Sequence, residues 1–208
     1  MALETPQDTW QAVTSGSLTL LDIRPPQAYT QGHVPGSVSA PFSRAGWGRA
    51  VATFLKSQGG NLGLFADSDI LARAAKDTLA SENVPVLAVY TGGPGGWKAA
   101  GLPLVSVENL TVDELHDKLR EWTVIDVREP YEWRSGVVPG ALRVPLGTLP
   151  DKLQELDPEA TYALICASGN RSQQAAAFLA DRGFRAANVV GGMSLWLGAG
   201  HPIERVLS

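Results

Sequence analysis

The chain has 208 residues, of which 44% are hydrophobic, and a net charge of −4, a profile typical of a globular protein with one or two domains. Its slight acidity, without any cluster of lysine or arginine, argues against nucleic acid as a partner. Residues 1–10 lack the apolar run of a secretory signal, and no apolar stretch is long enough to span a bilayer. We therefore expect a cytoplasmic protein that binds no membrane.

Cys166 is the only cysteine of the chain, so an internal disulfide cannot form. The three histidines (His33, His116 and His201) lie far apart in the sequence and show no metal-ligand spacing. We expect no metal and no organic cofactor.

Two segments of the chain repeat one another. They share an Asp-x-Arg motif and a Pro-Gly pair, and they are LLDIRPPQAYTQGHVPGSVSAP at residues 20–41 and VIDVREPYEWRSGVVPGALRVP at residues 124–145. Asp22 and Arg24 recur 104 positions later as Asp126 and Arg128. The chain is therefore predicted to contain two copies of one unit, at residues 1–104 and 105–208.

A second pair of matching motifs, further along each copy, shows by how many residues the two copies differ in length. Gly92 and Gly93 recur as Gly191 and Gly192 at a spacing of 99. The fall from 104 to 99 means that the first copy carries about five extra residues between the two matches. We place them at residues 43–60, a segment with several glycine and serine residues.

The expected elements of the second copy alternate between helices and strands. Thr111 and Glu114 form a capping box at the start of a helix whose apolar face extends to Trp122. The later elements are a strand at 124–127, a helix at 149–156, a strand at 162–166, a helix at 171–182, a strand at 187–190 and a helix at 192–199. Strands separated by helices predict the α/β class, with each copy a parallel sheet flanked by helices on both faces.

The candidate nucleophile is Cys166, at the carboxyl end of the strand 162–166, where open parallel sheets bind ligands. The residues after it are small or polar and can turn their amides toward one point as an anion-binding nest: Ala167, Ser168, Gly169 and Asn170. The following helix adds partial positive charge, and Arg171 adds a full one. Such surroundings lower a cysteine pKa from ~8.5 to roughly 3.5–7.5 and would also hold the outer sulfur of a persulfide.

A structural explanation competes with this one, because a lone cysteine is most often a small core residue and an arginine is often solvated. The context C-A-S-G-N-R-S favours a functional site. A cation in the first turn of a helix opposes the helix dipole. Arg171 therefore indicates that an anion lies nearby.

Four motifs together resemble the rhodanese family of sulfurtransferases: D-V-R-E at 126–129, V-P-G-A at 138–141, C-x-x-G-x-R-S at 166–172 and G-G-x-x-x-W at 191–196. The resemblance covers nearly the whole chain, once per half, and is therefore to a tandem-domain rhodanese. It implies that Cys166 is the catalytic cysteine and that residues 167–171 bind the anion. Supporting roles fall on four residues: Asp126, Arg128, Ser172 and Gly192. Val137 stands where the family usually has a histidine, as this chain has at His33.

The implied reaction moves sulfane sulfur from thiosulfate or a related donor to cyanide or a thiol, through a persulfide on Cys166. The expected partners are a small-molecule donor and acceptor, and a sulfur-accepting protein is a further candidate. Arg128, Glu129 and Trp133 follow the strand 124–127 and could line the cleft. Pairing of Arg128 with Asp126, and packing for Trp133, explain these residues equally well.

The first copy is predicted to be catalytically silent. At a spacing of 100, Ala66 stands where the second copy has Cys166, and Leu71 stands where it has Arg171. Asp67 and Asp69 add negative charge to the loop and would repel an anionic donor.

Two alternatives of other classes stay open. Phosphatases of the cysteine–arginine type resemble this loop, but they use five residues between the two side chains, whereas four separate Cys166 from Arg171. A non-catalytic module for protein contacts would suit the first copy better than the second.

Overall fold

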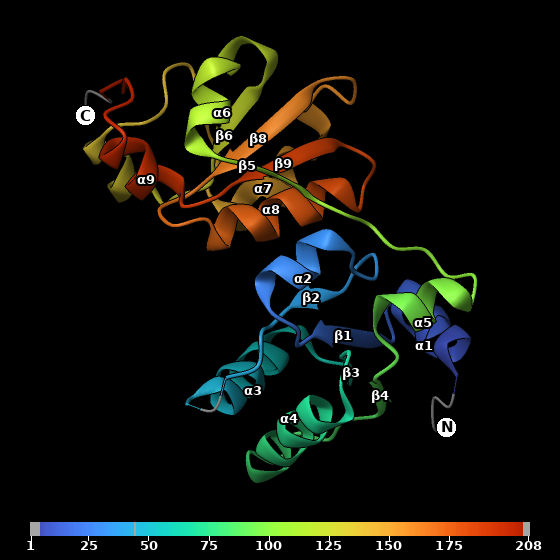
Figure 1. Cartoon of the computed structure of the whole chain (residues 1–208). Helices are drawn as coiled ribbons and strands as arrows, with labels where there is room; N and C mark the ends of the chain where they lie inside the picture. Colours follow the sequence, from blue (N-terminus) through green and yellow to red (C-terminus); the bar gives the residue numbers. More distant parts are fainter. Residues whose placement is uncertain (1–4, 44, 206–208) are drawn as a thin grey trace. The chain divides into compact units, whose positions relative to one another are not determined.

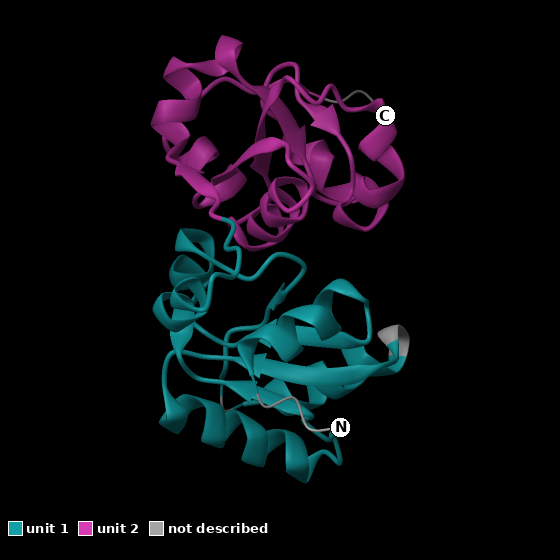
Figure 2. Cartoon of the chain, turned by 90° about the vertical axis from the view of Figure 1, so that its right-hand side faces the viewer, with its two compact units in different colours: residues 1–105 teal, residues 106–208 magenta. Residues whose placement is uncertain are grey.

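The computed structural model describes residues 5–43 and 45–205. The chain divides into two compact units, unit 1 at residues 1–105 and unit 2 at residues 106–208 (Figure 2). Within the described part of the chain, no helix has both the length and the apolar character needed to cross a membrane.

Unit 1 is a parallel sheet with helices on both faces (Figure 1). In chain order its elements are α1 (Pro6–Thr14), β1 (Leu18–Asp22), α2 (Pro26–Gln31), β2 (Val38–Ser39), α3 (Trp47–Gln58), β3 (Asn61–Phe65), α4 (Asp69–Ser81), β4 (Ala88–Tyr90) and α5 (Gly93–Ala99). The described strands lie in the order β2-β1-β3-β4, and every pair is parallel. Because strand side chains alternate between faces, Leu18 and Leu20 pack with α1 and α5, whereas Leu21 packs with α3 and α4.

Unit 2 has the same architecture with one more strand among its described residues. Its elements are β5 (Glu108–Leu110), α6 (Val112–Asp117), the 3₁₀ helix η1 (Leu119–Glu121), β6 (Thr123–Asp126), η2 (Pro130–Ser135), β7 (Leu142–Arg143), η3 (Leu146–Thr148), α7 (Leu149–Lys152), η4 (Leu153–Glu155), β8 (Thr161–Ile165), α8 (Asn170–Ala180), β9 (Arg185–Val189) and α9 (Gly192–Gly198). The strand order is β5-β9-β8-β6-β7, again entirely parallel. Helices α6 and α9 cover one face, and α7 and α8 lie on the other (Figure 1). The predicted α/β class and paired parallel sheets are confirmed.

The repeat seen in the sequence has a counterpart in side-chain contacts. Trp97 and Trp196 are both fully buried, and each indole N–H donates to the carbonyl of a proline six residues later, at 3.1 and 2.9 Å. Both tryptophans are thus part of the cores of their units. The equivalent tryptophan in each unit thus packs the last helix against the sheet.

The Asp-x-Arg motif forms a buried ion pair in each unit. The guanidinium of Arg24 donates to Asp22 at 2.5 Å, and that of Arg128 donates to Asp126 at 2.7 Å. Each arginine also donates to a backbone carbonyl eight residues later, at 2.7 Å in both units. Because a buried charge is costly without a partner, these contacts tie the end of the strand to the segment that follows.

Two of the expected helices in unit 2 are shorter than predicted. The capping box of Thr111 and Glu114 is present, but α6 ends at Asp117 and η1 follows it. Trp122 is extended rather than helical, because the chain must already enter β6 at the next residue, yet it still packs against the predicted core. The helix expected at 149–156 is instead α7 followed by η4.

The difference in length between the units is distributed differently from the prediction. The spacing of equivalent strands falls from 104 at β2 and β7 to 100 at β3 and β8, so four extra residues lie between β2 and β3. They belong to the segment that forms α3, a continuous helix where unit 2 has the short η3, α7 and η4. The fifth extra residue lies beyond β3, outside the segment 43–60. Strand β5, near the start of the second copy, was not predicted.

Candidate active site

Cys166 lies in the turn that joins β8 to α8. Strand β8 ends at Ile165 and α8 begins at Asn170, so the cysteine follows its strand directly, at the edge of the sheet where β6 also ends. The helix begins after Gly169, which has a φ of 100° and no side-chain capping bond. A Cβ at this glycine would lie 3.1 Å from the amide nitrogen of Gly191. The turn can therefore be this tight because residue 169 is glycine.

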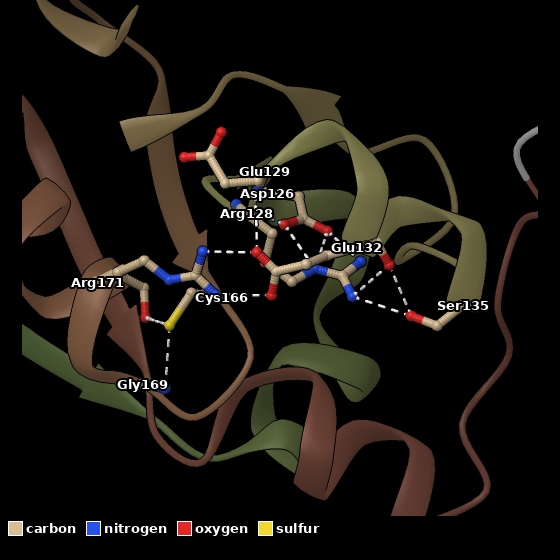
Figure 3. A network of polar contacts seen from close by, with 9 residues as sticks. Asp126, Arg128, Glu129, Glu132, Ser135, Cys166, Gly169 and Arg171 are labelled. Atoms are coloured by element: carbon tan, nitrogen blue, oxygen red, sulfur yellow. Dashed lines mark hydrogen bonds and ion pairs between the residues drawn. The ribbon is translucent and has the colours of Figure 1, made fainter. Parts of the chain in front are cut away.

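The sulfur of Cys166 is surrounded by hydrogen-bond donors (Figure 3). The amide of Gly169 donates to Sγ at 3.1 Å, and the hydroxyl of Ser172 donates at 3.4 Å. Burial by itself raises the pKa of Cys166, but the Ser172 hydroxyl and the amides of Ser172, Ser168 and Gly169 outweigh it and lower the pKa. The residue is 1% exposed. It is thus buried in a ring of donors rather than in an apolar interior.

Ser172 connects the sulfur to a chain of polar side chains that runs from the buried Asn188 to the exposed Asn109. Its hydroxyl lies 2.8 Å from Oδ1 of Asn188 on β9, and Nδ2 of Asn188 donates to Oδ1 of Asn109 on β5 at 3.0 Å. We expected Ser172 only in a supporting role, yet it contacts the sulfur directly. Asn188 was missed by the sequence reasoning, although a single amide side chain in the apolar strand A-A-N-V-V is a usable signal.

The start of α9 holds the loop from the other side. The amide of Met193 donates to the carbonyl of Cys166 at 2.8 Å, and Ser194 donates to the carbonyl of Ala167 through its amide at 3.0 Å and its hydroxyl at 2.8 Å. Gly192 has a φ of 54°, and a Cβ there would lie 2.2 Å from the carbonyl oxygen of Cys166. Residue 192 can therefore lie this close to the loop because it is glycine.

Arg171 is engaged by a carboxylate of the protein itself. Its two terminal nitrogens donate to Glu132 on η2 at 2.6 and 2.7 Å in a bidentate ion pair (Figure 3). The anion that the helix dipole indicated is thus Glu132, a residue the sequence analysis did not name. Its absence from the first copy, where Ala28 occupies the equivalent position, could have drawn attention to it.

The ion pair shifts both partners toward their charged forms. Hydrogen bonds from Arg171 lower the pKa of Glu132 to about 2, although burial acts in the opposite direction, and the amide of Glu129 adds to the lowering. Glu132 in turn raises the pKa of Arg171, with a smaller raising contribution from the Cys166 thiolate. Arg171 is therefore close enough to the sulfur for the two charges to interact.

A pocket of about 510 Å³ opens beside the loop. Its walls come from η2, the turn after Cys166 and α9, and its lining residues are Arg128, Tyr131, Glu132, Arg134, Ser135, Ala167, Met193, Ser194 and Leu197. Of the three residues expected at a cleft, Arg128 is in this lining as well as paired with Asp126. Trp133 instead packs with Arg143, whose Cζ lies 5.9 Å from the ring centroid.

Only some of the predicted loop residues contribute groups at the sulfur. Ser168 and Gly169 place their amides at the sulfur, and Ala167 lines the pocket. Asn170 is exposed at the start of α8. Among residues 5–43 and 45–205, there is no group of three or more His, Cys, Asp or Glu side chains that could hold a metal ion.

The fold and the loop define a class of protein: two tandem parallel α/β domains, the second with a cysteine surrounded by hydrogen-bond donors in a turn at the strand ends. A model of the rhodanese-like domain matches residues 5–100 and 111–199. The chain therefore belongs to the rhodanese family.

Individual relatives resemble parts of the chain. The Bacillus subtilis protein YtwF is 35% identical over 101 residues, which are 47% of this chain and 98% of its own length. A sulfurtransferase of Allochromatium vinosum is 36% identical over 81 residues, 38% of this chain and 76% of the relative. A thiosulfate sulfurtransferase of Pseudomonas entomophila is 34% identical over 74 residues, 35% of this chain and 68% of the relative.

One solved structure matches the tandem arrangement. The thiosulfate sulfurtransferase from Pseudomonas aeruginosa aligns with a TM-score of 0.50 and 22% identity, covering 100% of this chain and 44% of that one. At this identity the likeness supports the fold alone.

Proposed function

We propose that the protein is a sulfurtransferase that carries sulfane sulfur as a persulfide on Cys166. The observation that carries the proposal is the ring of donors around Sγ, formed by the amides of Ser168, Gly169 and Ser172 and the Ser172 hydroxyl. These groups stabilise a thiolate before the donor arrives. Rhodanese membership and relatives named sulfurtransferases support the same reaction type.

In the first step the thiolate of Cys166 attacks the outer sulfur of the donor. With thiosulfate, a new S–S bond forms to Sγ, the S–S bond of the donor breaks, and sulfite leaves with the bonding electron pair. No proton is transferred, so the step requires no general base. The negative charge moves from Sγ to the outer sulfur of the persulfide.

In the second step an acceptor removes the outer sulfur. Cyanide attacks that atom, the persulfide S–S bond breaks, thiocyanate leaves and the Cys166 thiolate is restored. A thiol or a protein thiol can take the sulfur in the same way. Donor and acceptor therefore react in turn at one sulfur, which predicts ping-pong kinetics.

The two units have different roles in this proposal, residues 105–208 catalytic and residues 1–104 catalytically silent. Unit 1 has Ala66 at the nucleophile position and Leu71 at the position of Arg171. In unit 1, α4 is capped by its own side chain, since Ser68 accepts from the amide of Leu71 at 3.5 Å. The amide of Leu71, in the first turn of α4, is therefore already bonded to Ser68.

The first test is the mass of the chain after incubation with thiosulfate. The intact protein should gain the mass of one sulfur atom, and a reductant or cyanide should remove it. Cys166→Ser should gain nothing and should lose transfer from thiosulfate to cyanide by at least about 10³-fold, as expected when a nucleophile is removed. Full activity in Cys166→Ser would refute the proposal.

A further inference from the structure

The Arg171–Glu132 ion pair places two opposite full charges beside the reactive sulfur (Figure 3). Its side chains are 31% and 17% exposed, and Glu132 lines the pocket next to the loop. Both terminal nitrogens of Arg171 are already bonded to the carboxylate. An anionic donor that approaches this guanidinium therefore meets the negative charge of Glu132 as well.

The pair stays ionised throughout the neutral range, because the pKa of Glu132 is lowered to about 2 by Arg171. The charge of Arg171 is thus largely balanced before any donor binds. The other charged residues that line the pocket are Arg128, which is paired with buried Asp126, and Arg134. The remaining attraction for an anion comes from Arg134 in the pocket lining and, at the sulfur itself, from amide dipoles, which carry only partial charges.

Unit 1 shows that the pair is not required by the fold. It has Ala28 at the position of Glu132 and Leu71 at that of Arg171, yet its four strands lie in the same order as the four equivalent strands of unit 2, and it retains the Asp22–Arg24 pair. Both members of the pair are absent from the unit that has no cysteine. The pair therefore belongs with the chemistry of Cys166 rather than with the stability of the domain.

We propose that Glu132 is a specificity-determining residue, which makes the site favour monoanionic organic sulfur donors over the thiosulfate dianion. The inference rests on the function proposed above and names the donor class of the same site. An alkanethiosulfonate illustrates the class: the Cys166 thiolate bonds to its outer sulfur, the donor S–S bond breaks, and an alkanesulfinate leaves with the electron pair. Thiosulfate reacts in the same way but has one more negative charge, which the carboxylate of Glu132 repels as the donor approaches the sulfur.

The test compares thiosulfate with methanethiosulfonate, two donors of the same outer sulfur that differ in charge. The kcat/KM for formation of the Cys166 persulfide is measured for both donors with the full chain. Glu132→Gln should raise the value for thiosulfate by about tenfold, the order expected when one nearby charge is removed from a partly solvated site. The value for methanethiosulfonate should rise by clearly less, so that the ratio of the two increases.

Two controls separate the specific charge from other effects. Glu132→Asp keeps the carboxylate and should keep the wild-type ratio. Glu129→Gln makes the same charge change three residues away, where Figure 3 shows the carboxylate pointing away from Arg171, and it should also keep the ratio. If Glu132→Gln does not fold, Glu132→Ala provides the same comparison, because unit 1 folds with alanine at this position.

An unchanged donor ratio in a folded Glu132 variant that still forms the persulfide would overturn the inference. A donor ratio that rises equally in Glu129→Gln would overturn it too, because the change would then come from the overall negative charge near the site and not from Glu132 in particular. Failure of the wild-type chain to form a persulfide with either donor would instead overturn the proposed function itself.

Discussion

The turns after β3 and β8 occupy equivalent places in the two units but differ in what their amides do. In unit 1 three residues separate the strand from α4, and the side chain of Ser68 caps the helix. In unit 2 four residues separate β8 from α8, the helix begins after Gly169 without a side-chain cap, and amides point to a sulfur. One fold thus directs the free amides of a helix N-terminus either to a capping side chain or to a neighbouring sulfur.

The largest expected difference between the two units is in the effect of replacing the glycine at the start of the last helix, which is Gly192 in unit 2 and Gly93 in unit 1. Gly192→Ala would place a Cβ 2.2 Å from the Cys166 carbonyl, whereas Gly93→Ala would place one 3.2 Å from the side chain of Asp67. Both residues have a positive φ, so both changes cost strain. Only Gly192→Ala should displace the reactive loop, with a loss of persulfide formation of about 10²-fold or more. The measurement is the rate of persulfide formation with thiosulfate.

In the same experiment Gly93→Ala serves as the matched control, and it should leave that rate within about twofold. Hydrogen exchange of peptides from each unit reports whether either change unfolds its domain. Equal losses of activity in the two variants would mean that strain, not the loop, is the cause.

A smaller effect is expected from Ser172→Ala, which removes one donor from the sulfur and leaves the backbone amides in place. The pKa of Cys166 should move upward, because that hydroxyl is the main group that lowers it. Since the thiolate is the reactive form, reactivity is lost as the pH falls through this pKa, and the loss should begin at a higher pH in the variant. The rate of alkylation by iodoacetamide as a function of pH measures the shift.

An identical alkylation profile in Ser172→Ala would show that the amides alone hold the thiolate. Ser168→Ala is a suitable control, because it keeps the backbone amide at position 168 and changes only an exposed side chain. Its profile should match that of the wild type.

The smallest effect should come from restoring a cysteine to unit 1. In a chain that already carries Cys166→Ala, Ala66→Cys should show no persulfide and no lowered pKa. Its helix begins one residue earlier and is already capped, and it has no equivalent of Arg171 or Glu132. Intact mass after thiosulfate treatment is the measurement. Persulfide formation in this variant would show that the sheet edge alone, without the uncapped turn of unit 2, activates sulfur.

The sequence was sufficient for the features that depend on local pattern. The two-copy architecture and the buried strands follow from spacing and periodicity, and the structure confirms them. The pairing of Arg128 with Asp126, one of the two explanations that the sequence left open for Arg128, is confirmed as well. The loop residues were predicted from their small size and their place between a strand and a helix. The role of these residues in catalysis stays a prediction.

The residues that were missed depend on contacts between distant parts of the chain. Glu132 lies 39 residues before Arg171, and Asn188 lies 16 residues after Ser172. Neither sequence separation matches the periodicity of a helix or a strand. These two contacts therefore could not be predicted from the sequence. Helix lengths failed for a related reason, since the end of α6 is set by where β6 must begin rather than by helix propensity.

The hydrogen bond between the side chains of Asn188 and Asn109 determines where a fragment that contains only unit 2 should start. Asn109 belongs to β5, whereas the family match resumes only at residue 111. A fragment cut at that family boundary would lose the edge strand and, with it, the acceptor that orients Asn188 toward Ser172. A fragment that starts at residue 106 would retain both.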